Sequence, residues 1–178
     1  LDNEQAVFAV AGILGIKDSV TRKSLMNFSG TWRRFEYKGQ TKNGASVYDD
    51  YGHHPTEIKA TLAGVRKKFL KQKIFCVFQP HLFSRTRLLL GDFAKSFGDA
   101  DAVIVTDIYA AREEDDKKTN SKSLVKKISR FHNNARYADS FESAEEILKS
   151  ESKKGDIILT MGAGDIYKVG IIVSNISS

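Results

Sequence analysis

The chain has 178 residues, 41% of them hydrophobic, which is enough to bury a core and argues against disorder of the whole chain. Its net charge of +6 favours anionic partners, phosphorylated small molecules or nucleic acid, or else reflects lysine-rich helix faces without any partner. The single cysteine, Cys76, excludes a disulfide framework or a cysteine-rich zinc site and suits a reducing, cytoplasmic setting.

No signal peptide and no apolar run of membrane-spanning length is visible, and we interpret the chain, which begins at Leu1, as a piece of a longer protein. Apolar residues at helical spacing predict helices over 3–16, ending at Gly15, and over 18–30, with Asp18 or Ser19 as N-cap and Gly30 as the stop. Residues 33–51 are predicted to form two strands joined by a loop rich in Lys, Asn and Gly.

The remainder alternates helices with strands. Pro55 suits the first turn of an amphipathic helix over 55–72. Continuously apolar runs predict strands buried on both faces at 73–79, 101–109 and 155–161. A shorter strand is predicted at 135–139. Helices are predicted between and after them, at 85–100, 120–131, 141–152 and 166–176.

This alternation predicts an α/β fold, a Rossmann-like, mostly parallel sheet with flanking helices. In such sheets ligands bind beyond the carboxyl ends of the strands. The segments that follow the predicted strands hold most of the chain's histidines and many of its arginines and acids, at 49–55, 79–87, 107–116 and 162–166. We therefore expect them to lie along one rim and to form a site.

The first of these segments, YDDYGHHPTEI (48–58), allows several interpretations. His53 and His54 are adjacent, so both cannot face one metal, and a transition-metal site would also need His81 and Asp50 or Asp107. One of the two aspartates could instead cap the helix that begins at Pro55. A phosphate site, a proton-transfer site and a simple strand-to-helix turn all remain open.

Two further motifs are ambiguous on their own. Arg85 and Arg87 stand near a predicted helix start, where they suit the capture of a carboxylate or phosphate, or form a solvated face. The GAGD turn after the last strand suits a phosphate or ligand turn, and a tight turn explains it equally well.

Taken together, five segments in order resemble the Mur ligase family: RRFE, VYDDYGHHPTEI, FQPHLFSRT, DIYAAREED and GAGDI. The HHP and QPH–SRT pairs are most similar to the member that joins L-alanine to UDP-N-acetylmuramate. The related ligase that attaches a whole tripeptide to UDP-N-acetylmuramate shares much of the pattern, so this alternative stays open.

The resemblance implies a three-domain parent that uses ATP to form an acyl phosphate, which the amine of alanine attacks. Residues 1–31 would be the last helices of its central ATP-binding domain, and 32–178 its C-terminal domain. The partners implied are ATP, L-alanine, UDP-N-acetylmuramate and the remaining domains of the parent chain, with neither nucleic acid nor a membrane. No GxxxxGK[ST] occurs in the 178 residues, so we expect this piece to be inactive alone, with the Mg²⁺ ligands mostly in the central domain.

The resemblance also assigns residues to the nucleotide. Asn3 matches the family's adenine contact, and Arg34 matches the hinge arginine that reaches ATP. Asp50 matches the aspartate that holds the ribose hydroxyls, a role suited to a carboxylate because it only accepts hydrogen bonds.

Four more residues match positions on the amino-acid and acyl-phosphate side: Tyr51, His53, His81 and Arg85. Arg85 is the expected ligand of the alanine carboxylate, and the two histidines, the expected catalytic residues, would donate hydrogen bonds or help remove the amine proton. The chain departs from the family at Leu82, where Arg or Lys is usual, and at Arg112, where Gly is usual. These departures put a phosphate contact and the turn after Ala111 in doubt.

The competing class is a non-catalytic, basic Rossmann-like module that binds nucleotides or nucleic acid. Its support is the net charge of +6. Against it, the lysines are spread over 59–73, 117–127 and 149–154, and no aromatic platform is interleaved with them.

Overall fold

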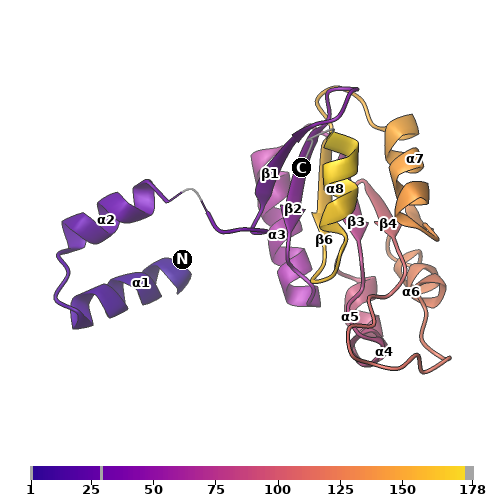
Figure 1. Ribbon diagram of the computed structural model, residues 1–178, viewed down its shortest axis with the longest axis horizontal. Coiled ribbons are helices and arrows are strands. Elements are labelled where there is room, and N and C mark those ends of the chain that lie inside the picture. Colours follow the sequence, from indigo (N-terminus) through magenta and orange to yellow (C-terminus); the bar gives the residue numbers. More distant parts are fainter. Residues whose placement is uncertain (1, 29, 175–178) are drawn as a thin grey trace. The chain divides into compact units, whose positions relative to one another are not determined.

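The computed structural model describes residues 2–28 and 30–174, which divide into two compact units, Leu1–Thr31 and Trp32–Ser178 (Figure 1). The first unit holds helices α1 (Asp2–Ile13) and α2 (Asp18–Met26), which pack against each other. Gly15 does follow the end of α1 with a positive φ of 70°. None of the helices described is long and apolar enough to cross a membrane.

The predicted ends of α2 were wrong. Its N-cap is Lys17, which is extended and makes no side-chain cap, while Asp18 stands inside the first turn. There a carboxylate interacts favourably with the positive end of the helix dipole without capping it. The helix also stops at Asn27, before Gly30.

The second unit is built on a six-stranded sheet with the order β1-β2-β6-β3-β4-β5. Its strands are β1 (Glu36–Gln40), β2 (Ser46–Asp50), β3 (Ile74–Phe78), β4 (Ala102–Val105), β5 (Ala135–Tyr137) and β6 (Ile157–Met161). Only β1 runs antiparallel to its neighbour, and all the other pairs are parallel. The predicted α/β class and the mostly parallel sheet are therefore confirmed.

Five helices cover the two faces of this sheet: α3 (Pro55–Lys68), α5 (Leu90–Ala94), α6 (Ser121–Ile128), α7 (Phe141–Glu151) and α8 (Tyr167–Ser174). A further short helix, α4 (Phe83–Leu88), contacts α5. One core lies under α3, α5 and α6, and a second lies under α7 and α8 (Figure 1). Strands β3, β4 and β6 are buried along their whole length because both faces are covered.

The helix predicted over 85–100 is two short helices. Leu89 departs from helical geometry between them, with φ −104° and ψ 18°, and Ser96–Ala100 is a turn region. Two glycines, Gly91 and Gly98, lower the helix propensity of this stretch, which explains why the apolar spacing overestimated its length.

Helix α3 begins as Pro55 predicted, but neither Asp49 nor Asp50 caps it. The cap is His54, whose ring accepts a hydrogen bond from the Thr56 N–H, while Glu57 accepts from the His54 N–H. This reciprocal capping box fixes the direction in which the chain leaves β2.

Candidate functional site

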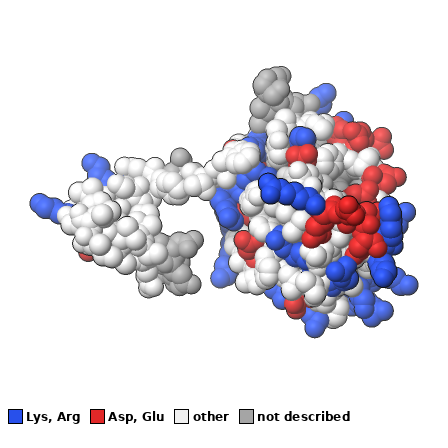
Figure 2. Space-filling model, turned by 60° about the horizontal axis from the view of Figure 1, so that its bottom comes forward, with Lys and Arg blue, Asp and Glu red and all other residues white. Residues whose placement is uncertain are grey.

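The carboxyl ends of β2, β3, β4 and β6 stand level with one another. Asp50 pairs with Met161, Met161 with Phe78, and Phe78 with Val105. The four segments that follow these strands therefore share one rim, at the lower end of the sheet in Figure 1, as predicted. Figure 2 turns this lower end toward the viewer and shows acidic and basic side chains intermingled there, with no single basic stripe.

A row of rings crosses this rim. The centroids of Tyr51 and His53 are 5.5 Å apart, those of His53 and His81 are 5.9 Å apart, and His81 stacks on Tyr109 at 5.6 Å. The structure thus brings together three of the four residues predicted on the amino-acid side. It adds Tyr109, which we had not predicted although it lies in the DIYAAREED segment.

Arg85 is the fourth predicted residue and joins the row through His81. Its Nη1 lies 3.2 Å from His81 Nδ1. Because a guanidinium only donates, Nδ1 must accept, and the proton of the neutral ring then lies on Nε2. Burial, followed by the charge of Arg85, lowers the pKa of His81 below its ordinary value. His81 is therefore kept neutral, with an N–H to offer.

His53 has the opposite arrangement. Its Nδ1 lies 3.1 Å from the carbonyl oxygen of Tyr51, and a carbonyl only accepts, so Nδ1 carries the proton. In the neutral ring, Nε2 is then left with a free lone pair. Glu57 anchors the segment by accepting from the His53 N–H at 2.9 Å. His54, by contrast, is exposed, and its ring serves as the cap of α3.

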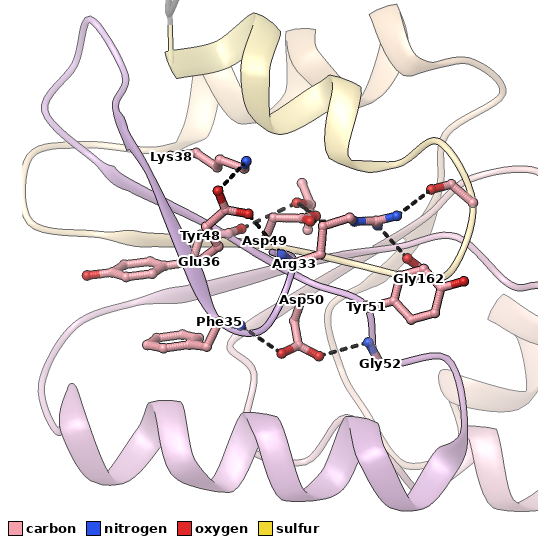
Figure 3. Close-up of polar contacts among 12 residues, drawn as sticks. Arg33, Phe35, Glu36, Lys38, Tyr48, Asp49, Asp50, Tyr51, Gly52 and Gly162 are labelled. Carbon is pink, nitrogen blue, oxygen red and sulfur yellow. Dashed lines mark hydrogen bonds and ion pairs between the residues drawn. The ribbon is translucent and has the colours of Figure 1, made fainter. Parts of the chain in front are cut away.

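Arg33, a buried arginine for which we had predicted no role, stabilises the rim through its hydrogen bonds. Arg33 is 2% exposed, and its Nε donates to Asp49 at 2.7 Å. Its two terminal nitrogens donate to the carbonyl oxygens of Gly162 and Gly164 (Figure 3). Burial raises the pKa of Asp49 although Arg33 and Thr160 both donate to it. The GAGD turn is thus a structural acceptor for Arg33.

The Arg33 backbone contributes as well. Its carbonyl oxygen accepts from the Tyr51 N–H at 2.7 Å, and its guanidinium lies 5.0 Å from the Tyr51 ring centre. Arg33 and Phe35 both have positive φ, 55° and 47°, a conformation that costs side-chain-bearing residues free energy. The signal for Arg33 was the RR pair itself, of which the resemblance assigned only Arg34.

The residues predicted to contact the nucleotide lie in different surroundings. Arg34 is exposed, 5.9 Å from the Tyr51 ring centre. Asp50 is only 5% exposed and accepts from the Phe35 and Gly52 N–H groups at 2.9 and 2.8 Å (Figure 3). It nevertheless lines a cavity of about 320 Å³, together with Phe35, Ala60, Thr61, Gly64, Val65 and Lys68. The side chain of Asn3 lies outside what the structure describes.

The 107–116 segment packs against the turn that carries His81. The backbones of His81 and Tyr109 form a parallel bridge, and Leu82 donates to the Tyr109 carbonyl oxygen at 2.9 Å. Leu82 has φ 71°. In the 107–116 segment the positive φ falls on Ala111, at 53°, and Arg112 does not share it. The family usually has Gly where Arg112 stands, and this departure put the turn in doubt. The positive φ is adopted one residue earlier, by Ala111.

No group of three His, Cys, Asp or Glu side chains in the described part of the chain is arranged to hold a metal ion. The two histidines of the row make hydrogen bonds to Tyr51 and Arg85, which orient their rings.

Comparison with known proteins identifies the family. The model of the Mur ligase, glutamate ligase domain matches residues 33–164. The UDP-N-acetylmuramate–L-alanine ligases of Alkaliphilus metalliredigens and Caldanaerobacter subterraneus are 50% and 46% identical over 94% of this chain. The chain spans 36% of the length of each.

Solved structures agree. The UDP-N-acetylmuramate-alanine ligase MurC of Thermotoga maritima is 27% identical over 97% of the chain, with a TM-score of 0.79, and the chain covers 36% of it. A murein peptide ligase of Psychrobacter arcticus, 23% identical over 96% of the chain, shares the fold with a TM-score of 0.71, and 36% of it is covered. This chain belongs to the Mur ligase family, and its residues 33–164 match the family's C-terminal domain.

Proposed function

We propose that this chain is the C-terminal part of an ATP-dependent ligase that joins L-alanine to UDP-N-acetylmuramate, and that its rim binds the amino acid. The observation that carries the proposal is the convergence of Tyr51, His53, His81 and Arg85, which lie in the segments that follow β2 and β3. Similarity over 94% of the chain to ligases of that name supports the choice of substrates.

Arg85 holds the carboxylate of alanine. One of its five N–H groups is directed at His81, and the others remain for a carboxylate, which suits the planar fork of a guanidinium. Tyr51, with Arg33 and Arg34 both near its ring, forms the neighbouring wall. The contact between Arg85 and His81 explains why an arginine stands four residues after a histidine in the QPHLFSR segment.

The two histidines divide the remaining work. His81 donates from Nε2 to an oxygen of the reacting acyl group, which stabilises negative charge that develops there. His53 accepts at Nε2 the proton that the attacking amine must lose. When bound, ATP supplies the phosphoryl group that activates the muramoyl carboxylate as an acyl phosphate.

On the nucleotide side, Asp50 receives the ribose, Arg34 reaches the phosphates and Asn3 contacts the adenine. The cavity beside Asp50 supports the ribose assignment. Oδ1 already accepts from the Gly52 N–H and the Thr61 hydroxyl, whereas Oδ2 accepts from the Phe35 N–H and keeps a lone pair for a ribose hydroxyl. Mg²⁺ would be held mostly by the rest of the parent enzyme. The 178 residues contain no GxxxxGK[ST] loop, so the chain alone is proposed to be inactive.

The proposal is tested with the parent enzyme, ATP and UDP-N-acetylmuramate. L-alanine, glycine, L-serine and the L-alanyl tripeptide are offered separately, and the conjugated product is measured by mass spectrometry. We expect L-alanine to give the highest kcat/KM. Exclusive use of the tripeptide would assign the chain to the recycling ligase, whereas no product with any of the four would contradict a ligase. The intermingled charges on the rim give no support to nucleic-acid binding.

A further inference from the structure

The turn that carries His81 and Arg85 is short and strained. Helix α4 has six residues, and its N-cap, Leu82, makes no side-chain cap and has φ 71° and ψ 133°. Backbone strain of this kind persists only where the surroundings hold it in place. The positions of His81 and Arg85 therefore depend on contacts made by another segment.

Glu113 supplies such a contact. One carboxylate oxygen accepts from the Ser84 N–H at 3.0 Å, and the other accepts from the Ser84 hydroxyl. Ser84 lies in the first turn of α4, where N–H groups have no partner within the helix. A carboxylate there satisfies a donor and interacts favourably with the helix dipole.

The same segment holds the turn at two more points. Tyr109 stacks on His81 and pairs with it through the backbone. Asp116 forms an ion pair with Arg87 at the other end of α4. The three contacts extend along the whole of α4, and that of Glu113 is made with Ser84, the residue immediately before Arg85.

We propose that Glu113 is a positioning residue, which holds the first turn of α4 so that Arg85 and His81 face the amino acid. The role attributed to that turn rests on the function proposed above. Glu113 acts on this turn through its two hydrogen bonds from Ser84. Its charge also acts on His81, since it raises the pKa of that ring while burial, Arg85 and His53 lower it.

The chain offers a matched control. Glu114 is the next residue, carries the same charge and is exposed, and among the described residues no hydrogen bond to its carboxylate is found. Glu113→Ala and Glu114→Ala therefore remove the same charge from the same segment, but only the first loses contacts to α4. Glu113→Gln keeps oxygen and loses charge, so it separates hydrogen bonding from electrostatics.

The first measurement is steady-state kinetics of the parent enzyme. Glu113→Ala should raise the KM for alanine roughly three- to tenfold, the range expected when the net contribution of one ordinary hydrogen bond is lost, with the KM for ATP unchanged. Glu113→Gln should restore much of the loss, and Glu114→Ala should resemble the wild type. In a Ser84→Ala background, Glu113→Ala should cost less than in the wild type, because the hydroxyl contact is already gone and only the contact with the backbone N–H of residue 84 remains to be lost.

The second measurement needs no ligase activity. In the 178-residue chain, NMR titration should show a lower pKa for His81 in Glu113→Ala, and shifted Arg85 side-chain resonances, with little change in Glu114→Ala. If Glu113→Ala and Glu114→Ala behave alike in both measurements, the proposal is overturned. If NMR shows the shifts while the KM for alanine stays constant, positioning by Glu113 is supported and the assignment of alanine to this rim fails.

Discussion

The buried Arg33–Asp49 pair permits a quantitative test of how the rim is held. Arg33→Ala would leave the Asp49 carboxylate, which is fully buried, without its ionic partner. It would also leave the carbonyl oxygens of Gly162 and Gly164 without their side-chain donors. Removing one member of a buried pair costs about 3–5 kcal/mol, and the lost carbonyl contacts overlap with this cost rather than adding fully. We expect the free energy of unfolding to fall by about 3–5 kcal/mol.

Urea unfolding followed by circular dichroism measures this change. With a denaturant slope of about 2 kcal/mol/M, the midpoint should fall by roughly 2 M. Arg34→Ala is the control, since Arg34 is exposed, and it should stay within about 0.5 kcal/mol of the wild type. Should Arg33→Ala fail to fold, Asp49→Asn, which keeps an acceptor for Arg33 Nε, should give a measurable intermediate loss. An Arg33→Ala loss below about 1 kcal/mol would refute the reasoning.

Three further predictions address the site. The folded-state pKa of His81, measured by NMR, should lie below 6.5. The contribution of His81 to stability is then present above its unfolded pKa and is lost as the pH falls through its folded pKa. An NMR titration midpoint above 6.5 would contradict this. Gly164→Ala places a Cβ 2.5 Å from Gln79 Oε1 and should cost about 1–3 kcal/mol in urea unfolding. Gly91→Ala is the control, because a Cβ at Gly91 meets open space, and it should not destabilise the chain. Equal losses of unfolding free energy in the two variants would count against the packing argument. Calorimetry should show that the 178-residue chain alone binds ATP only weakly, whereas micromolar binding would contradict its dependence on the rest of the parent enzyme.

The sheet could be predicted from the sequence because its central strands are buried on both faces and therefore continuously apolar. β3, β4 and β6 are such strands. Because strands that alternate with helices run parallel, the polar segments that follow them were expected to lie on one rim. The contact of His53 with His81 follows from that rule, although the two residues are 28 positions apart in sequence.

What could not be predicted depends on contacts between distant segments. Arg33 and Arg34 are adjacent residues of the same type, and only the fold decides that Arg33 is buried against Asp49 while Arg34 is exposed. The His54 cap was missed because histidine is not among the common N-cap residues, and the nearby aspartates were better candidates by propensity. Their carboxylates are instead used by Arg33, Phe35 and Gly52.

The central claim, that this rim binds the amino acid, is tested most directly by Arg85→Ala in the parent enzyme. Losing a charge-assisted carboxylate contact of about 2 kcal/mol or more should raise the KM for alanine by a factor of about 30, with the KM for ATP nearly unchanged. His54→Ala is the control and should affect alanine far less than His53→Ala, because His54 is exposed and caps α3. An unchanged KM for alanine in Arg85→Ala, or a larger loss from His54→Ala than from His53→Ala, would contradict the account.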